Sequence, residues 1–406
     1  MRAIMSNQMT EIIAKAQESY AKMLEEQLAR VERLKADAEP TDFSALPCII
    51  VGVLGGDGIG PAITQSGRNV LEFLLRDAVA SGKVEFRNIE GLTIERRAAL
   101  QKSIPDDTLA ELRSCHVILK GPTTTPQQGD SWSNVESANV SMRKELDLFA
   151  NVRAVRVPEE GIDWVFFREN TEGAYALGSN GVNVTDDLAV DFTITTTQGS
   201  ERIIRAAFEF AKQNGKTRVT AVTKANIIKT TDGKFLDIAR EIAKDYPGVE
   251  LDDWLADILT AKLIDPKRRT QFQVFVLPNL YGDIITDEAA EFQGGVGTAG
   301  GANIGTRYAM FEAIHGSAPR MVAEGRAQYA DPTSVMRAGA MMLSHMGFAR
   351  EADLLTRALD ICGITERKIA ITGRDTGCTC DEFAAYVMET CKKLAEADNA
   401  QKTTKE

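Results

Sequence analysis

The sequence is poor in several features on which whole classes of protein depend. No apolar run reaches the roughly 18 residues that cross a membrane. Lysine and arginine number 47 against 58 aspartates and glutamates, so the net charge is −11. A basic face is the usual footprint of nucleic-acid binding. We therefore expect neither a membrane nor a nucleic-acid partner, although a local basic pocket can still hold a small anion.

Cysteine is scarce as well. The six cysteines are scattered along a large chain, which is not the pattern of a disulfide framework. Cys378 and Cys380 lie close together, but they have no second pair and no nearby histidine, so they are poor zinc ligands. This usage favours a reducing, cytoplasmic compartment.

The N-terminal segment has no apolar signal core, and its many glutamates argue against a targeting peptide. Apolar residues recur at steps of three and four from Ile12 to Val31, which predicts an amphipathic helix that ends before Pro40. We expect this helical extension, residues 1–44, to pack on the body of the protein or on a second subunit.

A layered α/β organisation follows from the alternation of patterns after residue 45. "PCIIVGVLGGDGIGPAI" is a strand, a glycine-rich turn and a helix start, and similar pairs continue to "HVILKGPTTTP". This predicts a largely parallel sheet. The chain is too long for one core, so we expect two domains.

The residue pattern changes after Arg153. "WVFFRENTEGAYA" and the β-branched "DFTITTTQG" are predicted strands, the second exposed and able to pair with another subunit. A helix follows and ends at Gly215, and from about residue 305 we expect strands and helices to alternate again.

Polar side chains follow three predicted strands, where ligands bind in open α/β sheets. Two glycine-rich stretches nevertheless fail as dinucleotide-binding turns: "GGDGIG" has the wrong spacing, and "GVGTAG" (Gly295, Gly297, Gly300) follows a helical pattern. The side chains at the strand ends are Lys120, Thr123, Thr124 and Thr125; Lys224 and Asn226; and Asn279, Asp283 and Asp287.

Asp283 and Asp287 lie four residues apart, so on a helix both carboxylates face one way and can share Mg²⁺ or Mn²⁺. The pair can equally be acidic residues that favour a helix N-terminus. Asp257 is a candidate third ligand. Lys224 and Tyr175 are acid/base candidates, and each alone is also consistent with a surface role.

"SANVSMRKELDLFANVR", residues 137–153, places two arginines among apolar residues. A guanidinium is always charged and costly to bury unpaired. Arg143 and Arg153 therefore require an anion or an acidic partner.

Taken together, the motifs resemble the β-decarboxylating 2-hydroxyacid dehydrogenases, which act on isocitrate, 3-isopropylmalate or homoisocitrate. The resemblance runs in order from Val51 to His345. It is carried by "GGDGIGP", "KGPTTTP", "RKELDLFANVRAVR", "RENTEGAY", "TKANIIKTTDGKF", "NLYGDIITDEAA", "GGVGTAGGANIG" and "FEAIHGSAP".

The resemblance implies an answer for the arginines. Arg143, Arg153 and Arg168 take the positions that bind the substrate carboxylates, for which the guanidinium fork is well suited. Ser137 and Asn139 match the isocitrate branch, where they hold the extra γ-carboxylate; the isopropylmalate branch has apolar residues there. Isocitrate is thus the expected substrate, with 2-oxoglutarate and CO2 as products.

The resemblance also implies a site shared within a homodimer. Asp283 and Asp287 would hold Mg²⁺ or Mn²⁺ together with Asp257 of the partner subunit, although the spacing after Asp257 is shorter than usual. Lys224, also from the partner, would deprotonate the hydroxyl, and Tyr175 would protonate the enol.

The cofactor is expected on two loops rather than on a Rossmann turn. NAD is favoured over NADP, because the C-terminal "IAITGRDTGCTCDEF" lacks the tyrosine and arginine of the NADP pattern. Arg320 fits neither cofactor cleanly, and the loop that ends at Asp331 and Pro332 is longer than usual. The implied cofactor residues are Lys120, Thr123, Thr124, Thr125, Asn226, His315, Gly316, Ser317, Ala318, Arg320 and Asp331.

The implied fold is the isocitrate/isopropylmalate dehydrogenase α/β fold. Residues 45–148 and 294–406 would form a large domain, 149–172 and 198–293 a small domain, and 173–197 a dimer clasp. Other functions stay open: a 3-isopropylmalate or homoisocitrate dehydrogenase, a metal-free Rossmann dehydrogenase, and a silent regulatory subunit of a hetero-oligomeric isocitrate dehydrogenase.

Overall fold

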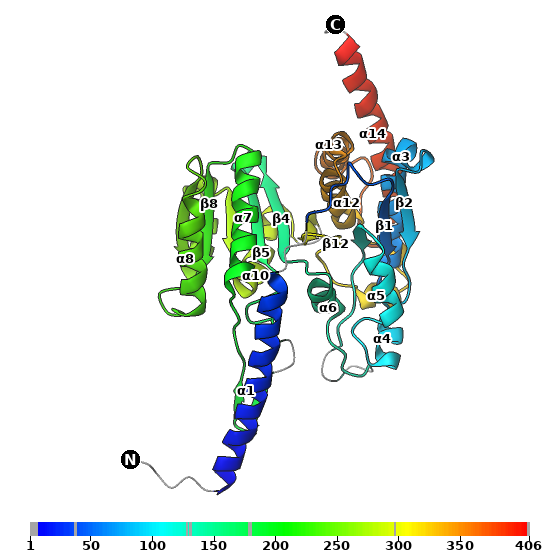
Figure 1. Ribbon diagram of the computed structural model, residues 1–406. Coiled ribbons are helices and arrows are strands. Elements are labelled where there is room, and N and C mark those ends of the chain that lie inside the picture. Colours follow the sequence, from blue (N-terminus) through cyan, green and yellow to red (C-terminus); the bar gives the residue numbers. More distant parts are fainter. Residues whose placement is uncertain are drawn as a thin grey trace. The chain divides into compact units, whose positions relative to one another are not determined.

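A computed structural model describes residues 7–35, 39–126, 129, 132–177, 181–295 and 298–403 (Figure 1). Two compact units are formed: unit 1 comprises Met1–Glu39 and Phe167–Ile284, and unit 2 comprises Pro40–Phe166 and Ile285–Glu406. The N-terminal helix belongs with unit 1. The functional roles of the expected domains stay a prediction.

Unit 2 contains a mixed sheet in the strand order β2-β1-β3-β12-β11-β4. The pairs β1–β2, β1–β3 and β12–β3 are parallel, as predicted, whereas β11 is antiparallel to both neighbours. These strands are β1 (Ile49–Leu54), β2 (Val84–Asn88), β3 (Val117–Lys120), β4 (Ala150–Val157), β11 (Gly300–Ile304) and β12 (Ala309–Ala313).

Helices cover both faces of this sheet. Helices α2 and α12 pack on one face, with α13 and α14 outside them. On the other face a buried apolar cluster joins the sheet to α5 and α6. The helices are α2 (Gly60–Leu74), α3 (Arg76–Ala80), α4 (Ile94–Leu100), α5 (Asp106–Arg113), α6 (Ala138–Glu145), α11 (Pro319–Ala323), α12 (Thr333–His345), α13 (Ala349–Asp360) and α14 (Cys380–Thr403).

Unit 1 has the parallel strand order β10-β8-β9, with α7 and α8 packed against it. The exposed ribbon β6–β7 and the N-terminal helix α1 belong to the same unit, and α1 contacts α7 and β6. The elements are α1 (Asn7–Leu34), β6 (Val182–Thr185), β7 (Leu188–Val190), α7 (Thr197–Gln213), β8 (Arg218–Thr223), α8 (Thr231–Ala243), β9 (Glu250–Leu255), α9 (Ala256–Ile264) and β10 (Val274–Leu277).

The chain passes between the units within β5 (Ile162–Glu169) and α10 (Asn279–Ala290). Short helical turns complete the structure: η1 (Pro158–Glu160), η2 (Arg269–Gln271), η3 (Glu291–Gln293), η5 (Ala327–Tyr329) and the π-helix η6 (Ile361–Thr365).

Two element predictions were wrong. "DFTITTTQG" is not a strand: Ile194 makes one bridge to Gly173, and the Thr196 hydroxyl accepts the Gly199 amide (3.0 Å) at the start of α7. The exposed strands lie earlier, at β6 and β7. The alternation does not resume either, because residues 314–403 contain helices and no strand.

All six cysteines are free thiols. Within the described residues, no helix is both long and apolar enough to span a bilayer. "DEAAEF" is helical, so the glycine stretch after it does not follow a strand. Gly297 of that stretch lies outside the described residues.

Candidate active site

In unit 2, a buried ion pair links the ends of two adjacent parallel strands. Lys120 on β3 and Glu312 on β12 are register partners, and Lys120 Nζ lies 3.1 Å from Glu312 Oε2. Arg143 Nη2, on α6, is 3.3 Å from the other carboxylate oxygen. Burial alone would raise the pKa of Glu312, but the charges of Lys120 and Arg143 outweigh it and lower this pKa to about 2.

Two cations thus share one carboxylate, which leaves a net positive charge at this site. The Arg143 side chain is 13% exposed, and its Nε is buried without a hydrogen-bond partner in the described structure. A buried guanidinium N–H is costly to leave unpaired. An anionic ligand would satisfy both the charge and this donor.

Ser137 and Asn139 lie at the start of the same helix. Asn139 Oδ1 accepts a hydrogen bond from the Thr123 hydroxyl (2.9 Å), so α6 contacts the loop after β3. Ser137 occupies the N-cap position, but its side chain makes no capping hydrogen bond. Both side chains are half-buried. One short helix therefore carries Ser137, Asn139 and Arg143.

A relay of buried amides continues from this ion pair across the sheet. Asn303 Nδ2 on β11 donates to Glu312 Oε1 (2.7 Å), and its Oδ1 accepts from Asn151 Nδ2 on β4 (2.9 Å). Asn151 Oδ1 in turn accepts from Arg153 Nε (3.0 Å). The two asparagines are register partners in the β11–β4 pair. Lys120, Arg143 and Arg153 are thereby connected.

Arg153 contacts α10 at the far end of this relay. Its Nη1 donates to the Thr286 hydroxyl (2.8 Å) and to Asp287 Oδ1 (2.5 Å). The Arg153 side chain is 8% exposed, whereas that of Asp287 is 57% exposed. The Asp287 carboxylate is therefore accessible to a further ligand.

The two loops expected at the cofactor do meet in unit 2. Thr124 Oγ1 and Ser317 Oγ are 2.8 Å apart, and Ser317 O accepts the Ile59 amide (3.0 Å). A Cβ on Gly58, whose φ is +62°, would lie 1.9 Å from Ser317 O, so only glycine allows this approach. The "GGDGIG" turn thus supports the loop that contains Ser317.

Asp57, within that turn, was missed as a supporting residue. Its carboxylate accepts the Thr124 amide (2.7 Å) and the Ile94 amide (2.8 Å), and lies 3.9 Å from Arg97. An aspartate among turn glycines was the available signal, because such a side chain can bind nearby backbone donors.

Other expected cofactor residues are differently placed. The Lys120 side chain is fully buried, and the Arg320 side chain is 88% exposed and paired with Glu324 (2.7 Å). Thr125 and Gly316 are exposed, His315 Nδ1 lies 3.0 Å from Gly316 O, and Ala318 has φ +46°. Asp331 Oδ1 accepts the Thr333 amide (2.8 Å) at the start of α12.

Unit 1 brings together a second group of predicted residues. Arg168, at the end of β5, donates through Nε (3.0 Å) and Nη2 (2.7 Å) to Asn279 Oδ1 and pairs through Nη1 with Asp283. The Tyr175 hydroxyl donates to Asp283 Oδ2 (3.0 Å), and the Arg168 guanidinium lies 5.6 Å from the Tyr175 ring centre. One predicted substrate residue, one acid/base residue and one metal ligand are thus in contact.

This contact depends on a close approach between Arg168 and α10. A Cβ on Gly282 would lie 2.4 Å from Arg168 Cγ and 2.7 Å from its Cβ. The Arg168 stem therefore fills the space that a side chain at position 282 would need. The sequence "NLYGD" gave no sign of this packing.

Lys224 and Asp257 form a separate pair in unit 1. Lys224 Nζ lies 2.5 Å from Asp257 Oδ1, and the Asp257 side chain is 61% exposed. The hydrogen bond from Lys224 lowers the pKa of Asp257 below its usual value. Asn226 lies in the exposed turn that follows.

The donor set is consistent with a hard divalent cation. Asp283 and Asp287 lie four residues apart on α10, and both carboxylates are partly exposed, at 38% and 57%. Within the described part of this single chain, no group of three or more histidine, cysteine, aspartate or glutamate side chains is placed to hold a metal. A third protein ligand would have to come from elsewhere.

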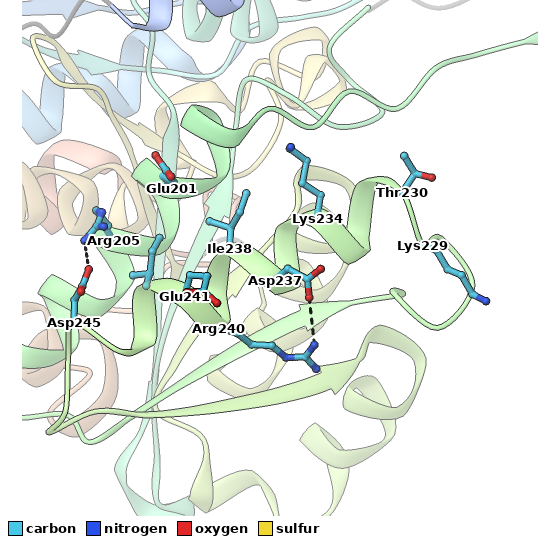
Figure 2. Close-up of a pocket in the computed structure, with 11 residues that line it drawn as sticks. Glu201, Arg205, Lys229, Thr230, Lys234, Asp237, Ile238, Arg240, Glu241 and Asp245 are labelled. Atoms are coloured by element: carbon cyan, nitrogen blue, oxygen red, sulfur yellow. Dashed lines mark hydrogen bonds and ion pairs between the residues drawn. The ribbon is translucent and has the colours of Figure 1, made fainter.

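A cavity of about 880 Å³ lies between α7 and α8 and is lined by none of these residues (Figure 2). Both basic and acidic side chains line it, and Arg205 Nη1 lies 3.0 Å from Asp245 Oδ2. A balanced, open, charged surface of this kind does not select an anion.

Comparison with known proteins identifies the family. Residues 50–387 match the family model described as isocitrate/isopropylmalate dehydrogenase, and the chain belongs to this family. It is 39% identical over 317 residues to an isocitrate dehydrogenase [NADP] of Rickettsia prowazekii, covering 75% of this chain and 61% of that protein.

Two further proteins support the assignment. The mitochondrial isocitrate dehydrogenase [NAD] subunit 2 of Schizosaccharomyces pombe is 35% identical over 76% of this chain and 79% of its own length. The crystal structure of isocitrate dehydrogenase from Methylococcus capsulatus superposes with a TM-score of 0.73 at 36% identity, covering 84% of this chain and 99% of that one. The predicted fold and family are confirmed.

Proposed function

We propose that the protein catalyses the oxidative decarboxylation of isocitrate to 2-oxoglutarate and CO2, with reduction of NAD to NADH. The observation that carries this proposal is the partly satisfied Arg143 guanidinium on the helix that also carries Ser137 and Asn139. A tricarboxylate with a hydroxyl group needs several cationic and polar partners, and this helix supplies three. An alkyl substituent would leave Ser137 and Asn139 without partners.

Binding is assigned to the three arginines. Arg143, Arg153 and Arg168 would exchange part of their present acidic partners for the carboxylates of isocitrate. Charge-assisted, bidentate bonds of this kind fix orientation as well as affinity. Asp283 and Asp287 would be released from these arginines and become available to a cation.

Those two aspartates, with Asp257 of a second copy of the chain, would hold Mg²⁺ or Mn²⁺. When bound, such an ion supplies Lewis-acid polarisation of the C2 oxygen. Sharing the site in this way requires a homodimer. In that assembly Lys224 would be contributed by the second copy together with Asp257, because the two side chains are already paired in each chain.

The protein side chains would then move two protons. Lys224 accepts the proton of the C2 hydroxyl as hydride passes from C2 to NAD. Loss of CO2 from the oxidised intermediate leaves an enolate, and the Tyr175 hydroxyl donates a proton to its carbon, which gives 2-oxoglutarate. Tyr175 is already oriented by its bond to Asp283 (3.0 Å).

NAD is the favoured acceptor because Arg320 and Arg326, two cations that could bind the 2′-phosphate of NADP, already pair with Glu324. Arg320 is 88% exposed and paired with Glu324, and Arg326 donates to Gly373 O (2.5 Å) and pairs with Glu324. The six free thiols support a reducing compartment such as the cytoplasm.

The test is a substrate panel with purified protein and Mg²⁺. We expect reduced cofactor to form with isocitrate at a kcat/KM far above that with 3-isopropylmalate or homoisocitrate. A preference for either alternative would contradict the assignment. If the protein alone does not turn over isocitrate but stimulates a catalytic isocitrate dehydrogenase subunit, the result would instead support the regulatory-subunit alternative.

A further inference from the structure

Helix α1 lies outside the residues that match the family, yet one of its side chains reaches the loop after β5. Arg30 Nη1 donates to Glu172 Oε1 (2.7 Å), and Arg30 Nη2 donates to the Thr171 hydroxyl (3.0 Å). The Arg30 side chain is 17% exposed and that of Glu172 only 3%. This is a forked, largely desolvated contact rather than a surface ion pair.

This region needs a cation, because Glu169 at the end of β5 and Glu172 in the loop are both buried carboxylates. Glu169 accepts the amides of Thr171 (2.8 Å) and Glu172 (2.6 Å), and burial together with the Glu172 charge raises the pKa of Glu169 to about 6. Arg202 of α7 also faces the loop and donates to the Thr171 hydroxyl (3.1 Å). Arg30 is bonded directly to Glu172.

Glu172 is connected to the candidate active site through its backbone. Its carbonyl oxygen accepts from Asn279 Nδ2 (3.0 Å). The other end of that amide, Oδ1, accepts two bonds from Arg168. Asn279 is itself 2% exposed, so its position is set by these bonds and by packing.

We propose that Arg30 is a positioning residue of the active site: by fixing Glu172 it holds Asn279, and through Asn279 it orients Arg168 toward the substrate carboxylate. The N-terminal helix is then a functional part of the enzyme and not only a packing element. This inference rests on the proposed function, because Arg168 must bind the substrate for its orientation to affect catalysis.

Steady-state kinetics of Arg30→Ala test the proposal. We expect KM for isocitrate to rise about three- to tenfold, as for other mutations along a coupled network, with KM for NAD unchanged. The rise should be greatest near pH 8, well above the pKa of Glu169. It should shrink as the pH falls toward 6 and Glu169 takes up a proton. A purely structural role would lower the melting temperature without this selective, pH-dependent change.

Arg33→Ala is the matched control, because Arg33 is an exposed arginine on the same helix. Glu172→Gln breaks the same pair from the other side and should give the same selective rise. The double variant Arg30→Gln with Glu172→Gln replaces the ion pair by a neutral contact and should return KM to within about twofold of wild type.

The outcomes separate the inference from the function on which it rests. If the wild-type protein does not turn over isocitrate, the proposed function fails. If wild type is active and either folded single variant keeps the wild-type KM for isocitrate, the role of Arg30 is overturned while the function stands.

Discussion

Lys120 Nζ and Glu312 Oε2 lie 3.1 Å apart at neighbouring strand ends, and both side chains are almost wholly removed from solvent. Breaking a buried pair from one side typically costs about 3–5 kcal/mol, because a charge is left uncompensated. Glu312→Gln would leave both Lys120 and Arg143 buried without a compensating negative charge. We therefore expect its free energy of unfolding, measured with urea, to fall by this amount.

The control for this variant is Glu250→Gln. Glu250 pairs with Arg218 at 2.9 Å, but its side chain is 62% exposed, so the expected loss is below about 1 kcal/mol. Equal losses in the two variants would show that the buried pair has no special role in stability.

A pH dependence is expected from His345. Burial lowers the pKa of His345 to about 4, and its ring packs against Phe43 (centroids 5.1 Å apart) and Phe311 (5.5 Å). The folded state binds its proton more weakly than the unfolded state. The stability linked to the neutral ring is therefore present above pH 6.5 and is lost as the pH falls toward 4.

This loss should amount to about 1–3 kcal/mol over that pH window. His345→Gln, which stays neutral, should flatten that part of the curve of melting temperature against pH. Identical curves for the variant and wild type would refute the assignment.

Substrate selection should depend on Ser137 and Asn139. Replacing them with Val and Leu should raise KM for isocitrate strongly, since hydrogen bonds to charged groups contribute about 1.5–3 kcal/mol each. The melting temperature should change little. Asn214→Leu, at an exposed position after α7, is the control and should leave KM unaltered. Unchanged isocitrate kinetics in the double variant would remove the basis for choosing isocitrate.

Activity should require a divalent cation. Protein stripped with EDTA should be inactive and recover with Mg²⁺ or Mn²⁺. Asp283→Asn should lower kcat by about 100-fold or more, consistent with the loss of several kcal/mol of charge stabilisation. Asp245→Asn, a change at a residue that lines the cavity of Figure 2, is the control and should leave kcat unchanged. Full turnover in metal-free buffer would instead favour a metal-free dehydrogenase.

Cofactor choice can be measured as kcat/KM with NAD and with NADP. We expect the NAD value to be higher, because Arg320 points to solvent and pairs with Glu324. In that case Arg320→Asp should change neither value by more than about twofold. A higher NADP value, abolished by Arg320→Asp, would reverse the assignment.

Motif order was sufficient to predict the fold, because strand and helix patterns alternate clearly around the glycine-rich turn. It failed at "DFTITTTQG", where β-branched residues favour a strand. What decides the structure there is a capping bond in which the Gly199 amide donates to the Thr196 hydroxyl oxygen. Propensity averaged over a window does not detect one such contact.

The sequence also located the charged residues of the site better than their partners. Lys120 follows a strand and was expected to face a cofactor, but its register partner across the sheet is Glu312. Pairing between strands almost 200 positions apart in the chain is not encoded locally. For the same reason the contacts of Asn303 and Arg30 could not be predicted, because their partners are distant in the sequence.

Gly282 has no functional group, yet its lack of a side chain determines where the Arg168 stem can lie. A methyl group at this position would meet the stem of Arg168 at 2.4 Å, so the arginine would have to turn away from its present partners. In a screen of single substitutions, position 282 would then behave like an active-site residue. Under the role proposed for Arg168, Gly282→Ala would weaken substrate binding without touching the substrate, because its methyl group would occupy the space of the Arg168 stem.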